Sequence, residues 1–502
     1  MARYKEVDYR QSLLLAVNYS EQILEGTFEY TLCYLFDNDK VDTTIFDKKY
    51  SNDKTGRKAI LPSVLLKIVL LAYSRGIFSS RRIERLCIEN ILFKSVSANT
   101  CPDHSTIANF ISSMDNEIKN IFVDVLLICN ELKLIGGEVF ALDGHKVSSN
   151  ASKEWSGTIS DLEKKKEKFE TMMNLLLKKH KETDVEEEKQ NYKTRIKKYN
   201  QKIQRIISFI QSNEPKKGRR IKEVQSNITD NESARMKSSH GIIQGYTGEA
   251  VVDSKNQIIV YAEAFGDGQE QEYVDDMVIG TEKTMMEVFQ RDNYLEGKIF
   301  LADNGNFSET NLEFLESKKI DAYIPDNAYR KRDPRYVTYQ RHKKKPSPAE
   351  DKSFYRIDKF QYDSKNDTFT CPKGVILKRS RNEGLIKGRY LGKRYVAPRT
   401  SCMKCELREK CLRNKSAKFK TLLTLRSIPN QKSFTEKMRE KIDSKEGREI
   451  YSRRMGIIEP VFANIRFQKR LNYFTLRTKQ KVNIQWNLFS LIHNIEKIRK
   501  FI

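Results

Sequence analysis

Two short apolar runs in the sequence each end in an aspartate. Residues 137–143 end at Asp143, and residues 298–303 end at Asp303. Such runs are typical of buried strands, and neighbouring strands of one sheet can bring their terminal acids side by side. Adjacent carboxylates repel unless a cation neutralises them, and oxygen ligands suit Mg²⁺ or Mn²⁺. The pair indicates a divalent metal site. The alternative is that each aspartate only caps a turn.

Glu459 is the natural third acid, because it lies in a predicted helix. Three acids could hold two metal ions. One ion would activate the oxygen that attacks a phosphodiester, and the other would stabilise the leaving oxygen. Pro460 disfavours helical angles at Glu459, so the helix is expected to kink or to begin there. One face of this helix, with residues spaced by four, four, three and four, should pack its apolar side chains on the sheet: Tyr451, Met455, Glu459, Phe462 and Arg466.

Four cysteines lie close together in a basic region of the chain. The middle two are separated by only two residues, and four thiolates could form a closed tetrahedral Zn²⁺ site that stabilises a loop-rich segment. The alternative is a set of reduced, unligated thiols. The remaining four cysteines are expected to be ordinary core residues. The candidate zinc ligands are Cys371, Cys402, Cys405 and Cys411.

Strands and helices alternate around these residues. Strands are predicted at 137–143, 245–253, 257–264, 298–303 and 321–325, and helices at 271–290, 308–317 and from 433 onward. This order predicts an α/β fold with a mixed sheet flanked by helices. The predicted domains are a helical DNA-binding domain at 1–135, a core beginning at 136–329, a basic, β-rich insertion with the four cysteines at 330–425, and C-terminal core helices carrying Glu459 at 426–502.

A charged helical hairpin interrupts the first part of the core at 158–212. Apolar residues recur every three or four positions on either side of a break at 180–185. A solvated coiled coil is the favoured interpretation, and an arm that contacts DNA is the alternative. A basic linker follows at 215–220. The region from Tyr329 to Lys420 interleaves basic and aromatic residues, most densely up to Lys345. This pattern would suit DNA, and a solvated basic loop is the alternative.

The composition favours a nucleic-acid partner. The 502 residues carry a net charge of +25, and the sequence pI is about 9.5. A chain this basic self-repels unless a polyanion is nearby. An anionic membrane is disfavoured, because the sequence contains neither an apolar run of spanning length nor a signal peptide. We therefore expect a cytoplasmic protein whose cysteines do not form a disulfide framework.

Three segments resemble the catalytic motifs of insertion-sequence transposases of the DDE type. Residues 142–151 resemble the first-aspartate motif, residues 301–308 the second, and residues 451–466 the glutamate helix. The resemblance implies an RNase H-like catalytic domain with a helical N-terminal module. It also implies that Asp143, Asp303 and Glu459 are catalytic and bind Mg²⁺ or Mn²⁺.

The same resemblance implies an activity and a set of DNA contacts. The enzyme would cleave the ends of its element and join the freed 3′-OH to target DNA, working as a homodimer in the synaptic complex. The residues expected to contact DNA are Tyr451, Arg454, Arg466 and Lys146. Arg454 lies five residues before Glu459, about 140° away around a helix, so we do not expect the two to share a phosphate.

Two other functions are compatible with the same residues. One is a metal-dependent RNase H-like nuclease that never joins strands. The other is a catalytically inactive or domesticated DNA-binding protein, in which the three acids would have no role.

Overall fold

The computed structural model divides the chain into two compact units, residues 1–324 together with 446–502, and residues 325–445. The N-terminal residues 1–16, the linker residues 218–220 and the basic residues 339–345 lie outside the described part, and so do the predictions made for them. The structure describes residues 17–50, 52, 58–217, 223–238, 241–267, 273–336, 354–355, 357–380, 384–386, 390–412, 414, 416–425 and 433–502.

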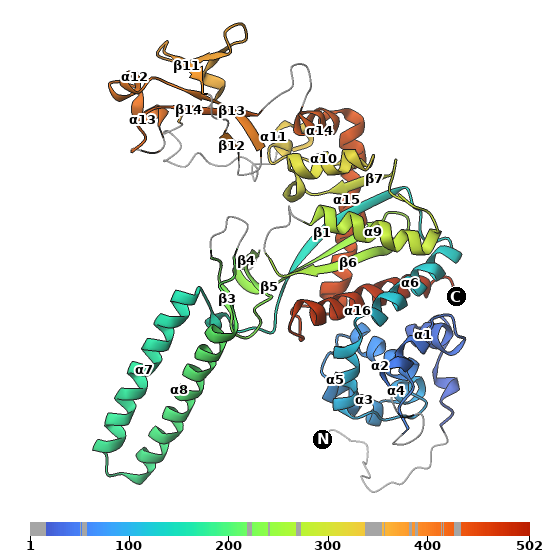
Figure 1. Ribbon diagram of the computed structural model, residues 1–502. Helices are drawn as coiled ribbons and strands as arrows, with labels where there is room; N and C mark the ends of the chain where they lie inside the picture. The colour runs from blue at the N-terminus through green and yellow to red at the C-terminus, as the bar shows by residue number, and fades with distance from the viewer. Residues whose placement is uncertain are drawn as a thin grey trace, which may run out of the picture. The chain divides into compact units, whose positions relative to one another are not determined.

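The first unit is built on a mixed sheet of six strands (Figure 1). Strands β1, β7 and β8 are parallel, β5 runs antiparallel to β1, and both β4 and β6 pair antiparallel with β5. The predicted α/β class with a mixed sheet is confirmed, as is the predicted β5–β6 hairpin. The strands are β1 Val139–Ser148, β4 Ala234–Ser238, β5 Gly241–Asp253, β6 Ile259–Phe265, β7 Ile299–Ala302 and β8 Asp321–Tyr323.

Helices cover the sheet, and a buried tryptophan fixes one of them. Trp486 is fully buried, its ring stacks on Phe462 at 6.2 Å, and its Nε1 donates to the carbonyl of Glu249 at 2.9 Å. Gly248 leaves room for the ring, since a Cβ there would lie 3.0 Å from it. The helices that flank the sheet are α9 Val274–Phe289, α10 Glu309–Ser317, α15 Lys445–Ala463 and α16 Lys479–Ile498.

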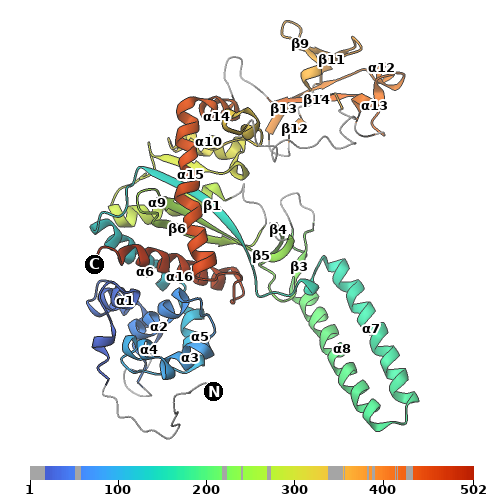
Figure 2. The same cartoon turned by 180° about the vertical axis from the view of Figure 1, so that it is seen from behind.

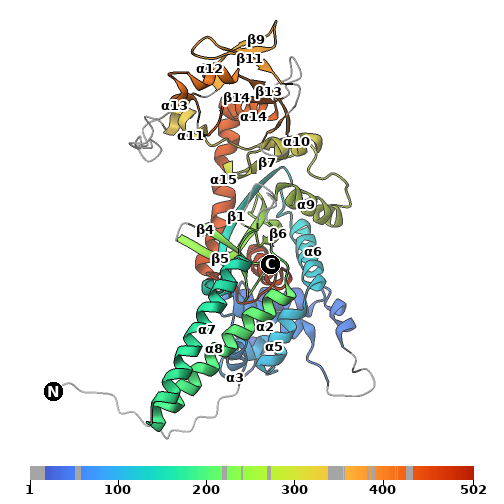
Figure 3. The same ribbon diagram turned by 60° about the vertical axis from the view of Figure 1, so that its left-hand side comes forward.

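Helix α16 packs against β6, the strand that is labelled near the C-terminus in Figure 3, and two of its asparagines bind the edge of that strand. Asn483 accepts from the N–H of Ala264 at 2.7 Å and donates to its carbonyl at 3.0 Å. Asn494 does the same with Ile259, at 2.9 and 2.8 Å. Edge strands expose unpaired backbone groups that invite another strand to pair. The side-chain amides occupy these groups at both ends of β6.

The helices before β1 also pack on α16. The rings of Tyr73 and Phe78 each lie 5.4 Å from Phe489 of α16. The apolar segment around residues 59–73 forms a buried helix, as predicted, and no helix among the described residues is long and apolar enough to cross a membrane. These helices are α1 Phe28–Asp37, α2 Pro62–Ser74, α3 Ser80–Glu89, α4 Ile91–Val96, α5 His104–Ser113 and α6 Asn116–Glu131.

The predicted helical hairpin is present as two long helices that run side by side (Figure 2). They are α7 Ile159–Glu182 and α8 Glu186–Ser212, so the break falls where the sequence predicted it. At the base, the short strands β2 Ser156–Gly157 and β3 Ser226–Asn227 pair with each other. A small core of Leu162, Ile206 and Phe209 joins the two helices there.

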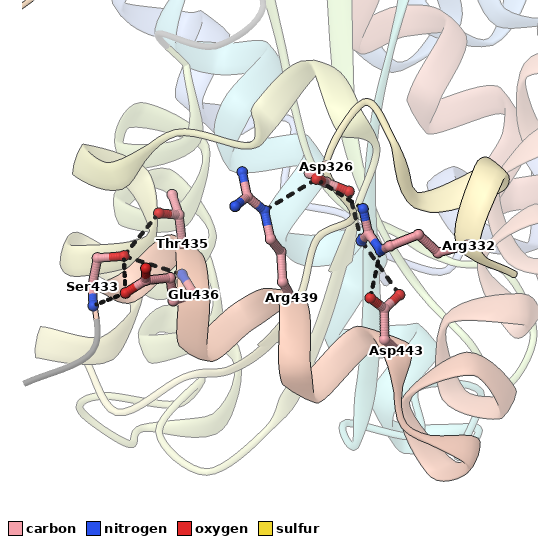
Figure 4. A network of polar contacts seen from close by, with 7 residues as sticks. All are labelled: Asp326, Arg332, Ser433, Thr435, Glu436, Arg439 and Asp443. Carbon is pink, nitrogen blue, oxygen red and sulfur yellow. Dashed lines mark hydrogen bonds and ion pairs between the residues drawn. The ribbon is translucent and has the colours of Figure 1, made fainter. Parts of the chain in front are cut away.

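The second unit contains a small antiparallel sheet with its own core, formed around Phe369, Leu377 and Tyr395. Its helical part is tied together by ion pairs, since Asp326 binds both Arg332 and Arg439, and Arg332 also binds Asp443 (Figure 4). The elements are α11 Tyr329–Arg332, β9 Gln361–Asp363, β10 Thr368–Thr370, β11 Ile376–Arg379, β12 Gly384–Ile386, β13 Tyr390–Val396, α12 Arg399–Met403, α13 Arg408–Cys411, β14 Thr421–Leu425 and α14 Phe434–Asp443.

Candidate active site

Asp143 and Asp303 follow the same register step on two adjacent parallel strands. The last pair between β1 and β7 joins Leu142 to Ala302, and each aspartate is the next residue of its chain. The prediction that the first strand ends at Asp143 is wrong. Strand β1 continues to Ser148 because β5 still pairs with it, Asp143 facing Ala250. Asp143 therefore lies where β1 loses its parallel neighbour, and Asp303 lies at the equivalent position after β7.

Asp303 also caps a turn. Its Oδ1 accepts from the N–H of Gly305 at 2.9 Å and from Nδ2 of Asn306 at 3.1 Å, at the start of the 3₁₀ helix Asn304–Asn306. The capping role that the sequence offered as the alternative is therefore real for this residue. It fixes the direction of the carboxylate and does not exclude a second role.

Glu459 lies within α15, which neither begins nor breaks at Pro460. A proline inside a helix leaves the carbonyl four residues earlier without its N–H donor. Here that carbonyl belongs to Gly456, and Nε2 of Gln257 donates to it at 2.9 Å. The side chain of the β5–β6 turn thus replaces the missing helical bond. This replacement allows the helix to continue past Glu459.

The face of α15 that packs on the sheet differs from the predicted one. Its buried residues include Arg454, Ile457, Ile458 and Val461, whereas Met455 is 53% exposed. The three-four spacing was counted correctly, but the spacing cannot say which of two adjoining faces is turned inward. The exposed stripe carries Glu459 instead.

Arg454 is the buried cation of the site. Its Nη2 lies 2.7 Å from Oδ2 of Asp143, and its side chain is 9% exposed. Burial alone would lower the pKa of Arg454, but the charges of Asp143, Tyr451, Asp303 and Glu459 raise it above its ordinary value. All three candidate acids therefore act on one guanidinium. Although Arg454 and Glu459 lie on different faces of α15, the long arginine side chain brings its charge within reach of both strands.

Two of the predicted DNA-contacting residues line one pocket beside Asp143. Lys146 and Arg466 contribute to a pocket of about 310 Å³ that Gly144 and His145 also line. Arg466 lies in a π-helical segment, Asn464–Gln468, which interrupts the α-helical period after Ala463. The seven-residue spacing from Glu459 therefore could not have located Arg466.

The pocket also contains residues that the sequence did not single out. Lys237 and Ser238 of β4 and Asn472 are among its other lining residues. Lys237 is exposed, like Arg235 two residues earlier. That alternation of basic residues along an edge strand is the signal that could have identified Lys237.

Carboxylates are the donors that Mg²⁺ favours, and the charges of all three candidate acids raise the pKa of the buried Arg454. Among the residues that the structure describes, no three His, Cys, Asp or Glu side chains are arranged to hold a metal ion. The metal assignment for Asp143, Asp303 and Glu459 thus depends on the type of donor and on their shared interaction with Arg454. It stays a prediction.

The four cysteines of the second unit interact electrostatically. Burial raises the pKa of the Cys411 thiol, and Cys402, Cys371 and Cys405 raise it further, against a lowering by Lys420. The backbone N–H of Val375 donates to Sγ of Cys371 at 3.3 Å. Cys371, Cys402 and Cys411 pack against the core of this unit. Cysteine thiolates are the soft donors that zinc favours, and zinc binding likewise stays a prediction.

Comparison with protein families gave two matches. A transposase DDE domain matches residues 370–499, which include Glu459 and all four clustered cysteines. A transposase domain of the DUF772 family matches residues 17–113, within the N-terminal helices. Comparison with the curated proteins and with the solved structures found no match.

Proposed function

Because this chain belongs to the insertion-sequence transposases of the DDE type, we propose that it cleaves the ends of its element and joins the freed 3′-OH to target DNA. In this proposal Asp143, Asp303 and Glu459 hold two Mg²⁺ or Mn²⁺ ions. Two copies of the chain would bring the two element ends together in a synaptic complex. The reaction would take place in the cytoplasm, where the DNA is.

One observation carries the proposal: the three acids share Arg454. The β1–β7 register sets Asp143 beside Asp303, and Arg454 connects them electrostatically to Glu459 on α15. An aspartate at a strand end can be explained as a cap. Three acids from two strands and one helix all interact with one buried cation. This arrangement is better explained as a binding site for cations.

The residues around the candidate active site would have different roles in the reaction. Divalent ions, when bound, would favour deprotonation of the attacking oxygen and offset charge on the leaving oxygen. Lys146 and Arg466 would bind phosphates of the DNA end in the pocket of about 310 Å³. Arg454 would orient Asp143 through their ion pair at 2.7 Å before the ions bind. Tyr451, one turn before Arg454 on the same helix, would complete the DNA contacts.

The same proposal covers the architecture. The strand order β6-β5-β1-β7-β8, in which β5 alone runs against the others, supports an RNase H-like core. The helical hairpin and the cysteine-bearing unit would be insertions in this core. A structural zinc ion on Cys371, Cys402, Cys405 and Cys411 would stabilise the second insertion.

The test is a cleavage and strand-transfer assay on labelled duplexes that carry the ends of the element. We expect nicked product and a joined product with Mg²⁺, and neither with a chelator. Asp143→Asn and Glu459→Gln should each lower the rate by at least about 100-fold while the protein remains folded. Glu449→Gln is the matched control, because Glu449 is an exposed acid of the same helix whose partner is Arg453.

Two outcomes would overturn the proposal in different ways. Cleavage without any joined product would make the protein a nuclease on the same fold. Equal activity of Asp143→Asn, Glu459→Gln and Glu449→Gln would remove the acids from the chemistry altogether.

A further inference from the structure

The base of the α7–α8 hairpin contains a pocket that shares no residue with the acid-bearing site, which we define by Asp143, Asp303, Glu459 and Arg454. It measures about 440 Å³, and its walls come from the segment just before β2 and from α8, the hairpin helix that is labelled in Figure 1. We call it the arm pocket, defined by Trp155, Arg195, Lys198, Tyr199, Lys202 and Arg205.

Helix α8 concentrates positive charge on this pocket. After Glu188 the chain has seven basic residues and no acid until Glu214. Four of the seven face the arm pocket, at steps of three, four and three residues, which keeps them on one side of the helix. Within the described part of the chain none of these four is ion-paired with an acid, and like charges at this spacing repel. The four are Arg195, Lys198, Lys202 and Arg205.

Aromatic rings contact two of these four cations, Lys202 and Arg205. Trp155 has Lys165 of α7 at 5.3 Å and Arg205 of α8 at 5.2 Å from its ring. Lys202 lies 5.6 Å from the ring of Tyr199. Trp155 itself is anchored, since its carbonyl accepts from the N–H of Ile228 at 3.0 Å. The charges are thus preorganised over a half-buried aromatic surface.

We propose that the arm pocket is a second DNA-binding site, which holds the sugar–phosphate backbone of DNA bound at the acid-bearing site. A row of unpaired cations beside aromatic rings is the combination that binds nucleic-acid backbones. Helix α8 is about 40 Å long. DNA that passes the base of the hairpin could therefore be bound at a distance from the cleavage point. This inference rests on the proposed function only in taking DNA as the substrate.

The first experiment compares two triple variants of the full chain. Lys198→Gln/Lys202→Gln/Arg205→Gln removes three charges from the arm pocket. Lys189→Gln/Lys193→Gln/Lys197→Gln removes three charges from the same helix outside it. Both are made in an Asp143→Asn background without divalent metal, so that a fluorescein-labelled duplex is bound but not cut.

We expect the arm-pocket triple variant to bind the duplex at least tenfold more weakly than the control triple variant at about 0.1 M salt. The slope of log affinity against log salt should become shallower by about 2.7, since each phosphate contact contributes about 0.9. The control triple variant should lose less than half of this slope. Equal slopes for the two triple variants would overturn the proposal.

A second experiment reads the pocket directly. The sequence has only two tryptophans, Trp155 and Trp486, and Trp486 is fully buried behind the sheet. In a Trp486→Phe protein the emission therefore reports Trp155, and duplex DNA should quench it and shield it from iodide. If Trp486→Phe fails to fold, the difference between the parent and Trp155→Phe gives the same signal.

The two proposals fail separately. DNA binding with unchanged Trp155 emission would overturn the arm pocket and leave the cleavage chemistry standing. Quenching of Trp155 by DNA in a protein that never cleaves its element ends would support the arm pocket and overturn the proposed function.

Discussion

The guanidinium of Arg454 lies 2.7 Å from the carboxylate of Asp143, and the side chain of Arg454 is 9% exposed. This ion pair gives the acid-bearing site an internal counter-charge. The same arginine interacts with Asp303 and Glu459, so its removal would leave three carboxylates to repel one another.

Replacing Arg454 should therefore destabilise the metal-free protein and make it more responsive to metal. We expect Arg454→Met to cost about 3 kcal/mol of unfolding free energy, the usual penalty for leaving a buried charge unpaired. Mg²⁺ should then raise the melting temperature of this variant more than it raises that of the parent. Arg453→Met is the control, because Arg453 is 57% exposed and pairs with Glu449 on the surface. Identical Mg²⁺ responses in all three proteins would contradict this role for Arg454.

The two roles of Asp303 can be separated by two substitutions. Asparagine can still accept the capping bond from Gly305, whereas alanine cannot, so Asp303→Ala should be about 1 kcal/mol less stable than Asp303→Asn. Both variants should lose DNA cleavage, because neither has a carboxylate. Stability is measured by thermal denaturation and cleavage on labelled duplex. An active Asp303→Asn would show that this residue is a cap and nothing more.

The bond from Gln257 to the carbonyl of Gly456 should matter only because residue 460 is proline. Gln257→Asn, which is too short to reach, should cost about 1 kcal/mol. In a Pro460→Ala background the helix can supply its own donor, so the same substitution should cost much less. The double-mutant cycle by urea unfolding measures this coupling. The contact of Gln257 with Lys497 is lost in both backgrounds and cancels. Additive effects would disprove the compensation.

His493 should make the first unit acid-sensitive. Burial lowers the pKa of His493 to about 3, while an unfolded histidine titrates near about 6.5. Between these values the unfolded chain binds a proton that the folded chain does not, so stability falls as the pH falls through that window. From pH 7 to 5.5 the free energy of unfolding should fall by about 1 kcal/mol. The measurement is urea unfolding, monitored through the fluorescence emission of Trp486.

A matched pair of substitutions isolates this effect. His493→Gln should abolish that part of the pH dependence, whereas His104→Gln, at an exposed position, should keep it. If the His493→Gln protein lost stability with acid as steeply as the parent, the titration would have to be assigned to other groups.

Zinc binding can be tested by measuring the zinc content of the purified protein. If the four clustered cysteines hold a structural ion, the purified protein should contain one zinc per chain, and Cys402→Ser should lose it together with part of the thermal stability of the second unit. Cys101→Ser is the control. The expectation that Cys101 is a core residue is wrong, since it is an exposed thiol of the first unit. Equal zinc contents in the two variants would rule out this site.

The sequence predicted the elements better than their ends and faces. The break of the hairpin at 180–185 and the β5–β6 pair were visible because periodicity and turn residues are local. The end of β1 was not, because Asp143 stays in the strand through its pairing with β5, about a hundred residues away in the chain (Asp143 with Ala250). The local pattern around residues 137–143 contains no trace of that partner.

The site shows the same division. Asp143 and Asp303 could be proposed from their positions after apolar runs and Glu459 from its place in a predicted helix, and the structure brings Lys146 and Arg466 to one pocket. The central place of Arg454 could not be predicted, because helical geometry alone turns it away from Glu459. Only the packing of α15, with Arg454 facing the sheet, shows that the arginine reaches Asp143. The role of Gln257 depends on a contact between residues 199 positions apart.

The asparagine bonds to β6 also set a condition on how the chain folds as it is made. Ala264 and Asn483 are separated by 219 positions, and the whole cysteine-bearing unit is synthesised between them. A ribosome therefore releases β6 long before the helix that shields it exists. During that interval the growing polypeptide presents a strand open to intermolecular pairing, and nascent chains crowded on one message would be most at risk of sticking together there.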